Sequence, residues 1–524
     1  MQVPTVIDRT RHRDRTILTQ SRELDLRAIS MSGNALGTLC TFNGLPFFSP
    51  TGQQWIKSRT GEDVNLAHMS PKPSTSNQVT STGVPHSVAL PEKEVVIQLL
   101  DEWGPSILSR LFPFINRELL EFTIKAAYHD EVSVSSPGAD SARACIHAFT
   151  AVCLSSSIYR GHEVMHAEDH VHAAYKLLPG LLIELVTLDG LQTVLMLCLC
   201  SLVVTGNIFY LEMLLATSSR FVFHLNGHLA PVYINDDLQF KTKLHTRTLF
   251  WICYITDKEF SLRTGHPPCL DETHCDLTLP DIQQTTQEFL TCIRLAILLS
   301  QVYHGLYSMK ALHGTDNQLL GTIRDLDNAL ETWRMSIPAR NRPRLIDRET
   351  DVISTPNTLI QLQYLYCMAM IHHASGKCSV WVQNHDTSEA GSSLAISVEA
   401  SRSMLQKFLD DCFHFDKNNL RYAHVVFSST FQTAKLRRRF CLPYFLTAIC
   451  HLFSNILLNP LDEGSDDDLD LIRSVPTHIR DRLPPEIPRL SSHQVKLFED
   501  FVMELGRLAS SAVNKAQELF EANN

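Results

Sequence analysis

The chain has 524 residues, of which 44% are hydrophobic and 19% charged, with a formal net charge of −10. This length predicts about two to four ordinary domains or one large helical array, and the composition excludes general disorder. Free-standing nucleic-acid binders are usually basic, because they neutralise phosphates. The acidic balance therefore excludes a surface devoted to DNA, and any direct DNA contact is expected in a short basic segment.

The first 39 residues form a polar basic tail in which four arginines alternate with other residues: Arg9, Arg11, Arg13 and Arg15. Such a tail indicates disorder, a nuclear import signal or the remnant of a DNA-contacting arm. The tail lacks the apolar core that a signal peptide would have, which favours a reducing intracellular compartment. Residues 40–90 are predicted to be loop-rich. Within them, 40–65 is expected to form an ordered loop or hairpin, and 66–90 a Ser/Thr/Pro-rich linker.

From Pro91 onward apolar residues recur at helical spacing, and short Gly, Pro and Asn turns separate segments of about 12 to 25 residues. The prediction is an all-α fold, a large helical array of stacked helix pairs over 91–480, followed by a C-terminal helix within 481–524. The apolar stretch 191–216 contains Gln192, Gly206, Asn207 and Glu212. We therefore expect two buried helices meeting near Gly206, and no membrane as a partner.

The most informative segment is Arg247–Pro280, an apolar helix followed by an acidic loop. Gly265 is expected to adopt a positive φ and end the helix, and Pro267 and Pro268 then force an extended chain. Asp257 lies within the apolar helix and should be a structural residue, because a buried carboxylate needs a partner. We expect this partner to be a helix end or a cation such as Arg247 or Arg263.

This segment resembles the middle homology region of fungal zinc-cluster transcription factors. That family has an arginine before a Leu-Phe-Trp helix, an aspartate six residues after the tryptophan, Gly-x-Pro-Pro, and an acidic loop that ends in Leu-Pro. The matching positions are Arg247, Trp251, Asp257, Gly265, Pro267, Pro268 and Pro280, and His266 stands where the family usually has arginine. Four other segments are similar to the family in the same order, so the resemblance covers roughly 40–480: 44–61, 188–225, 360–373 and 442–475.

The resemblance implies an α-helical regulatory domain in a nuclear regulator of RNA polymerase II genes, such as those of a metabolic or biosynthetic pathway, and no catalysis. It implies promoter DNA and the transcription machinery as partners, a small-molecule effector or partner protein as the signal, and homo- or heterodimers as assemblies to test. We expect an effector pocket among the helices of 188–310, with activity switched by a population shift.

The family's DNA-binding module is a cluster of six cysteines that holds two zinc ions and begins with C-x-x-C. This sequence has 14 cysteines, but only Cys40 precedes Cys145 and no C-x-x-C occurs. The chain therefore cannot build that cluster, and no cofactor is expected in it. Two readings follow. Either an upstream exon encodes the zinc cluster, or the protein is a non-DNA-binding partner of another zinc-cluster factor.

A literal H-E-x-x-H spans His162, Glu163 and His166. In a zinc metallopeptidase the two histidines would hold zinc one helical turn apart and Glu163 would activate water, which makes this a distant alternative function. However, Asp169 occupies the position where a metzincin needs glycine. We expect a solvated helix face without catalysis, with His162, His166 and His170 only as weak candidates for adventitious metal binding at i, i+4 and i+8.

Two charged runs have competing interpretations. Four basic residues precede an apolar helix and indicate either a solvated helix start or a nuclear import signal: Lys435, Arg437, Arg438 and Arg439. The acidic run 462–470 lies in a polar break predicted over 460–470. It is interpreted as a solvated turn, with an activation-type surface as the less favoured alternative.

Overall fold

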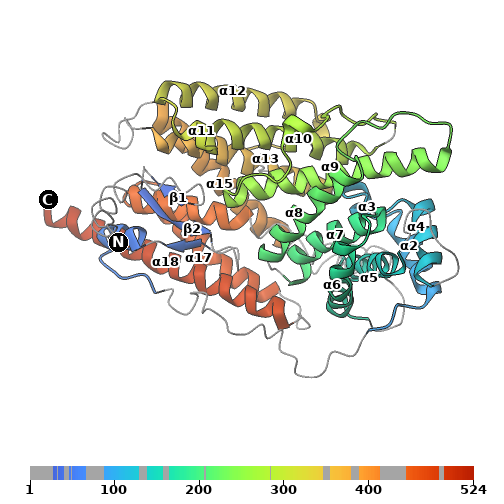
Figure 1. Cartoon of the computed structure of the whole chain (residues 1–524). Helices are drawn as coiled ribbons and strands as arrows, with labels where there is room; N and C mark the ends of the chain where they lie inside the picture. The colour runs from blue at the N-terminus through green and yellow to red at the C-terminus, as the bar shows by residue number, and fades with distance from the viewer. Residues whose placement is uncertain are drawn as a thin grey trace, which may run out of the picture.

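The structure is a computed structural model that describes the following residues: 28–31, 34–39, 46–48, 50–65, 88–128, 138–156, 158, 165–205, 208–283, 285–345, 355–378, 389–413, 444–482 and 489–523. Helices dominate this part of the chain, which confirms the predicted all-α class (Figure 1). They pack around two hydrophobic cores, and two consecutive helices contribute side chains to both.

A small antiparallel sheet lies near the N-terminus, in the order β1 (Ala28–Met31), β2 (Asn34–Leu39) and β3 (Pro46–Phe48). β2 and β3 form a hairpin, with Thr38 opposite Phe47, but only β3 lies within 40–65, where a loop or hairpin was expected. Two boundaries differ from the prediction. The strands begin inside the segment expected to be a tail, and 50–60 is the helix α1 (Pro50–Thr60). Proline is compatible with the first helical turn, so Pro50 starts α1 and does not prevent it.

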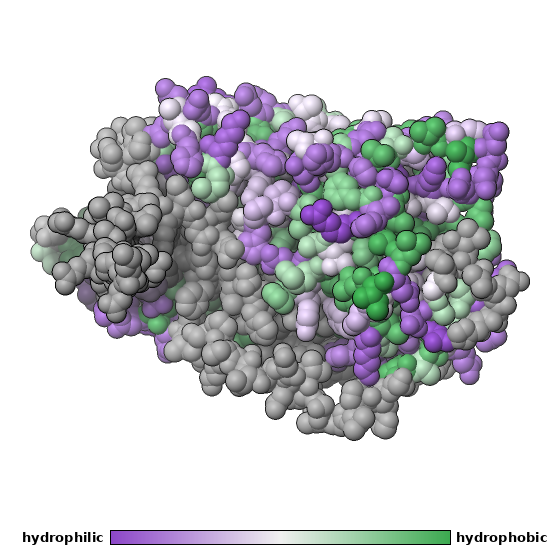
Figure 2. All heavy atoms as spheres, viewed as in Figure 1, coloured by the Kyte–Doolittle hydropathy of each residue, from purple (hydrophilic) through white to green (hydrophobic). Residues whose placement is uncertain are grey.

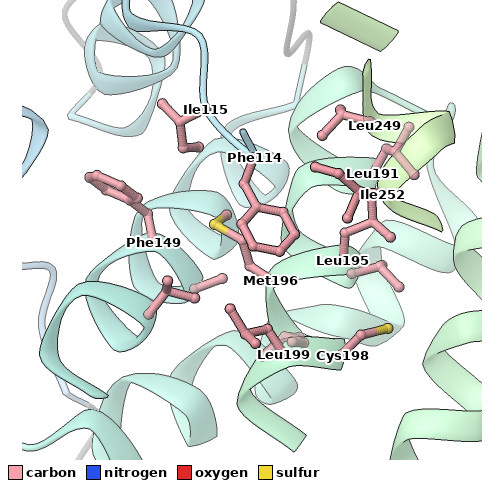
Figure 3. Close-up of a cluster of buried hydrophobic side chains, with 14 of the residues drawn as sticks. Phe114, Ile115, Phe149, Leu191, Leu195, Met196, Cys198, Leu199, Leu249 and Ile252 are labelled. Atoms are coloured by element: carbon pink, nitrogen blue, oxygen red, sulfur yellow. The ribbon is translucent and has the colours of Figure 1, made fainter. Parts of the chain in front are cut away.

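The first core is built by helices of the N-terminal half: α2 (Lys93–Trp103), α3 (Ile107–Leu111), α4 (Arg117–Ala127), α5 (Ala139–Ser155), α6 (Ala167–Ile183), α7 (Leu188–Cys200) and α8 (Ile208–His224). Figure 3 shows the ring of Phe114 among side chains of α7 such as Leu195 and Met196. Every residue of α7 is buried, and a π-helical turn, Ser201–Thr205, extends it.

Separate helices α7 and α8 confirm the two-helix interpretation of 191–216, whose junction at 206–207 lies outside the described residues. Among the described residues, one continuous helical stretch, Gln287–Leu312, is long and apolar enough to cross a membrane. The fold buries 72% of its apolar window, as in the core helix of a globular protein.

The two shared helices are α9 (Asp237–Thr264), of which Leu262 belongs to the second core, and α10 (Gln287–Val302). Ile293 and Ala296 on one face of α10 belong to the first core, whereas Leu295, Leu298 and Leu299 belong to the second. This division follows from helical spacing, because residues three and four apart share a face. A π-helical turn, Tyr303–Tyr307, and the short helix α11 (Met309–Leu312) complete this stretch.

The second core is built by C-terminal helices: α12 (Asp316–Met335), α13 (Thr355–His373), α15 (Glu389–Phe413), Tyr444–Leu458, α17 (Ser465–Arg482) and α18 (Arg489–Asn523). Short 3-10 turns lie at Glu272–His274, Ala339–Asn341 and Ala374–Lys377. The predicted polar break at 460–470 is too long, because α17 already begins at Ser465 and three aspartates occupy its first turn. Acidic side chains stabilise the positive end of a helix dipole there.

The N-terminal segment and the C-terminal helix pack together. Phe48 and Ile56 are buried in the second core, and the ring of Phe48 stacks on Phe501 of α18 at 6.1 Å between centroids. Polar contacts continue this seam. The Asn65 N–H donates to Glu504 Oε1 at 2.7 Å, and Arg507 Nη2 donates to the Asp63 carbonyl at 2.9 Å. The expected hairpin-and-loop segment therefore docks on the body of the protein.

Candidate functional site

The site that the sequence analysis singled out lies on α9 and on the loop of residues 265–286 that follows it. Asp236 caps the first turn of α9 by accepting the Gln239 N–H at 3.0 Å. From His245 to Thr264 most residues of the helix are buried, and three charged residues among them are at 5% exposure or less: Arg247, Asp257 and Lys258. Burying these charges costs free energy unless partners compensate for it, so their partners define what the site does.

Arg247 connects two loops. Its Nη1 donates to the carbonyls of Gly227 and His228 in the loop between α8 and α9, at 3.3 and 3.0 Å. Its Nη2 donates to the carbonyls of Asp276 and Thr278 in the loop after α9. The planar five-donor guanidinium suits such a fork, which the single ammonium of lysine would not reproduce. The Arg247 side chain therefore fixes both loops to α9 and to each other.

The aromatic part of the motif surrounds this guanidinium. The Arg247 Cζ atom lies 4.9 Å from the ring centroid of Trp251 and 4.4 Å from that of Phe250, at cation–π distance. Trp251 also packs edge-to-face on Tyr254 at 5.5 Å. Burial lowers the pKa of Arg247, and the Asp276 carboxylate opposes this shift. The motif residues Arg247 and Trp251 therefore form one packed unit.

Asp257 holds the loop by its backbone. Its Oδ1 accepts the Cys269 N–H at 2.7 Å and its Oδ2 accepts the Leu270 N–H at 3.1 Å, while Lys258 Nζ lies 3.2 Å from Oδ2. Burial raises the pKa of the Asp257 carboxyl, and Lys258 and the two N–H groups work against this rise. These contacts make Asp257 a structural anchor for the segment after the two prolines.

Lys258 completes the anchor by binding the carbonyl of the same residue, Leu270. Its Nζ donates to the Leu270 carbonyl at 2.6 Å and lies 3.8 Å from Glu272 Oε1. The Tyr254 hydroxyl donates to this Glu272 oxygen at 2.5 Å, and burial together with Glu272 raises the pKa of Tyr254. We call Arg247, Tyr254, Asp257, Lys258 and Glu272 the loop clasp. Ion pairs and hydrogen bonds join its members to one another and to the two loops.

Asp257 does pair with a cation, but this cation is Lys258 and neither of the two arginines predicted for it. Arg247 is used by the backbone carbonyls, and Arg263 Nη2 pairs with Glu259 Oε1 at 3.1 Å. Sequence reasoning missed Lys258, because a lysine next to an aspartate on a helix normally points in another direction. The missed signal was the adjacent charged pair inside an otherwise apolar helix.

The turn after α9 follows the prediction. Gly265 has φ 72° and its N–H donates to the Ser261 carbonyl at 2.8 Å, which ends the helix in the left-handed conformation that glycine adopts most easily. Pro267 and Pro268 then lead to the anchored Cys269 and Leu270 without helix or strand. His266, which replaces the usual arginine, places its Nδ1 2.7 Å from Glu212 Oε1 of α8.

The histidines proposed for metal binding do not share a helix face. His166 is exposed and has extended φ and ψ, because α6 begins only at Ala167. His170 is buried, and its Nδ1 faces His147 Nδ1 of α5 at 3.0 Å. The helical spacing assumed for His162, His166 and His170 is therefore wrong at its middle position. No group of three or more metal-ligating side chains occurs among the described residues, and His162 and Glu163 lie outside them.

Other predicted positions have different outcomes. The basic cluster Lys435, Arg437, Arg438 and Arg439 and the arginines of the tail lie outside the described residues. The acidic run is partly structural, because Asp468 is fully buried and accepts from Arg402 Nε at 2.6 Å and Nη2 at 3.0 Å. The effector pocket expected within 188–310 stays a prediction.

Comparison with known proteins agrees with this architecture. Residues 106–335, which include all of α9 and the loop clasp, match the family model described as "Fungal specific transcription factor domain". The chain is therefore similar to this family over 106–335, which is less than half of its length. This finding confirms the resemblance seen at Arg247–Pro280, and the clasp lies inside the matched region.

Relatives with curated names extend the similarity beyond that domain. The chain is 24% identical to an "ABC-transporter-regulating transcription factor" of Aspergillus oryzae, over 91% of this chain and 54% of that protein. A protein of the same name from Aspergillus fumigatus gives the same values. A "Fusaridione A cluster transcription factor" of Fusarium heterosporum is 31% identical over 17% of this chain and 19% of its own length. The chain spans about half the length of the first two relatives.

Proposed function

We propose that this chain is the helical regulatory part of a nuclear regulator of RNA polymerase II genes and that it performs no catalysis. The observation that carries the proposal is the family match over 106–335, together with the loop clasp on α9 within that region. The names of the relatives, which include a regulator of ABC transporters and a regulator of a gene cluster, support a metabolic or biosynthetic set of target genes.

Contact with promoter DNA has two routes in this proposal. The sequence contains no C-x-x-C, so its own residues do not form a two-zinc cysteine cluster, and the net charge of −10 argues against a broad DNA surface. DNA is then bound either by residues outside this chain or by a zinc-cluster partner. In both routes the helical body supplies the regulatory signal, through an effector or a partner, by shifting a conformational population.

A tethering experiment tests the function directly. The full chain is fused to a heterologous DNA-binding domain and expressed in a fungal host with a matching reporter gene. Recruitment is expected to change transcription of the reporter in either direction, compared with the DNA-binding domain alone. An unchanged reporter, with fusion protein present at the promoter by chromatin precipitation, would contradict a regulatory role.

The route to DNA is tested separately with purified protein. If a zinc-cluster partner is needed, the chain alone leaves a promoter fragment unshifted, and the chain together with that partner shifts it further than the partner alone. The alternative as a zinc metallopeptidase predicts one tightly held zinc per chain, which Glu163→Ala leaves bound while it abolishes peptide hydrolysis. A folded chain without zinc by atomic absorption ends that alternative.

A further inference from the structure

The loop clasp fixes two loops whose outer sides expose large apolar side chains. Leu229, Val232 and Tyr233 in the loop before α9 are 49%, 75% and 71% exposed, and Leu279 and Ile282 in the loop after α9 are 38% and 62% exposed. Most exposed apolar residues occur singly and need no explanation, whereas contiguous ones mark interaction sites. Hydrophobic side chains reach the surface at several places on the half of the molecule that holds α2–α9 (Figure 2).

These residues belong to one surface because the two loops are hydrogen-bonded to each other. The Asp276 N–H donates to the His228 carbonyl at 2.9 Å, next to Leu229. Arg247 binds carbonyls of both loops, and the Asp276 carboxylate accepts the N–H of Thr278, which precedes Leu279, at 2.8 Å. We call Leu229, Val232, Tyr233, Leu279 and Ile282 the loop patch. These bonds hold the backbone next to Leu229 and Leu279, which lowers the ordering entropy that binding costs there.

Acidic groups border the loop patch. Asp236 and Asp237 follow Tyr233 at the start of α9, and Asp281 precedes Ile282; all three are exposed. Asp276, in the loop after α9, lies beside His228 of the other loop. Hydrogen bonds from Thr278 lower the pKa of the Asp276 carboxyl, which keeps it ionised at neutral pH. Lys241 offsets this negative charge only in part, because its ammonium is shared between Asp237 and Glu118, at 2.8 Å from each.

We propose that the loop patch docks a partner protein through a segment that presents leucine or aromatic side chains flanked by lysine or arginine. Apolar contacts with the patch supply the affinity, and the acidic border selects the charge and speeds association. A second copy of this chain fits less well, because it would bring the same acidic border against itself. This docking surface goes beyond the proposed regulation of transcription, because it is inferred from the exposed apolar side chains and their acidic border.

The test uses the full chain and three helical peptides of identical apolar face whose flanking residues are lysine, glutamine or glutamate. Binding is measured by fluorescence anisotropy at low and high salt. The lysine peptide is expected to bind about tenfold more tightly than the glutamate peptide, with a smaller difference at high salt, where exposed charges are screened. Equal affinities for the three peptides would overturn the proposal.

Variants locate the site. Val232→Ser, Tyr233→Ser and Ile282→Ser combined should weaken the lysine peptide by about tenfold or more. A matched control combines three other exposed apolar positions, Ile183→Ser, Met309→Ser and Leu461→Ser, and should bind as the unaltered chain does. Equal weakening in both triple variants, at equal melting temperature, would overturn the assignment of this surface.

Two further measurements separate charge and self-association. In the double variant Asp236→Asn with Asp281→Asn, each amide oxygen can still accept the backbone N–H that the aspartate accepts, from Gln239 and Gln283. The variant should nevertheless lose most of the preference for the lysine peptide. Sedimentation velocity of the chain alone should be unaffected by the loop-patch variant. A dimer that this variant dissociates would show that a second copy occupies the patch, which would overturn the proposed partner.

Discussion

His147 and His170 face each other across the interface of α5 and α6, with 3.0 Å between their Nδ1 atoms and both side chains buried. At this distance one nitrogen donates and the other accepts, so the accepting ring must be neutral and the pair cannot hold two protonated rings. Burial and the neighbouring ring lower the pKa of His147 to about 4, and burial lowers the pKa of His170, which Asp169 partly opposes.

This pair predicts a loss of stability on acidification. The unfolded chain binds protons at these histidines from about pH 6.5 downward, whereas the folded chain takes them up only near pH 4 at His147. Stability contributed by the neutral pair is therefore present above pH 6.5 and lost as the pH falls toward 4. For His147 alone the full change is about 3 kcal/mol. His147→Asn should flatten the fall in urea-unfolding free energy between pH 7 and 5.

The exposed His304 on the π-helical turn after α10 provides the control for this experiment. His304→Asn should leave the pH dependence of the unfolding free energy as it is in the unaltered chain. An equal flattening by both substitutions would mean that the pH dependence does not arise at the pair.

Removal of the charge at Asp257 should destabilise the loop after α9. Asp257→Asn leaves Lys258 charged and buried opposite a neutral amide, and breaking a buried pair in this way typically costs about 3–5 kcal/mol. The double variant Asp257→Asn with Lys258→Met should lose less than the sum of the single changes. Chemical denaturation of the four proteins measures the coupling; strict additivity would show that the two charges do not interact.

Arg247→Lys keeps the charge and removes the fork that joins the two loops. One ammonium cannot serve four carbonyls, so we expect a loss of about 2 kcal/mol and faster limited proteolysis at 228–236 and 276–283. Arg324→Lys on the exposed side of α12 is the matched control and should leave both readouts unchanged. Loops that stay resistant in Arg247→Lys would mean that other contacts hold them.

The acidic run at the start of α17 contains two aspartates with opposite environments. Asp468 is buried against Arg402, whereas Asp466 is exposed. Asp468→Asn should lower the free energy of unfolding by about 3 kcal/mol, and Asp466→Asn by well under 1 kcal/mol. Thermal unfolding distinguishes them. Equal small effects would favour the view of the whole run as a solvated surface.

Local features of the fold could be predicted from sequence because they depend on near neighbours. The polar residues within 191–216 indicated two helices, which are α7 and α8, and Gly265 with the prolines after it located the end of α9. Contacts between distant segments could not be predicted in this way. The Arg402–Asp468 pair joins residues 66 positions apart, and the His147–His170 pair joins residues 23 apart. Spacing within one helix says nothing about which residue of another helix will lie opposite.

The candidate site shows the same limit. The motif identified Arg247, Trp251 and Asp257 as structural residues, and φ at Gly265 agrees with its predicted role. The clasp also needs Tyr254, Lys258 and Glu272, whose roles depend on how the loop folds back over α9. Only the backbone course after Pro268 brings the Leu270 peptide between Asp257 and Lys258.

The seam between α1 and α18 has a consequence for synthesis of the chain. Asn65 and its partner Glu504 are 439 positions apart, and Phe48 and Ile56 are buried in the second core, where the ring of Phe48 lies against Phe453 and Phe501 of late helices. At about 5–20 residues per second, the ribosome synthesises these partners roughly 20–90 s after the early apolar side chains. A newly made chain therefore carries an unsatisfied hydrophobic segment through most of its time on the ribosome. Chaperone binding to this segment would bridge the interval.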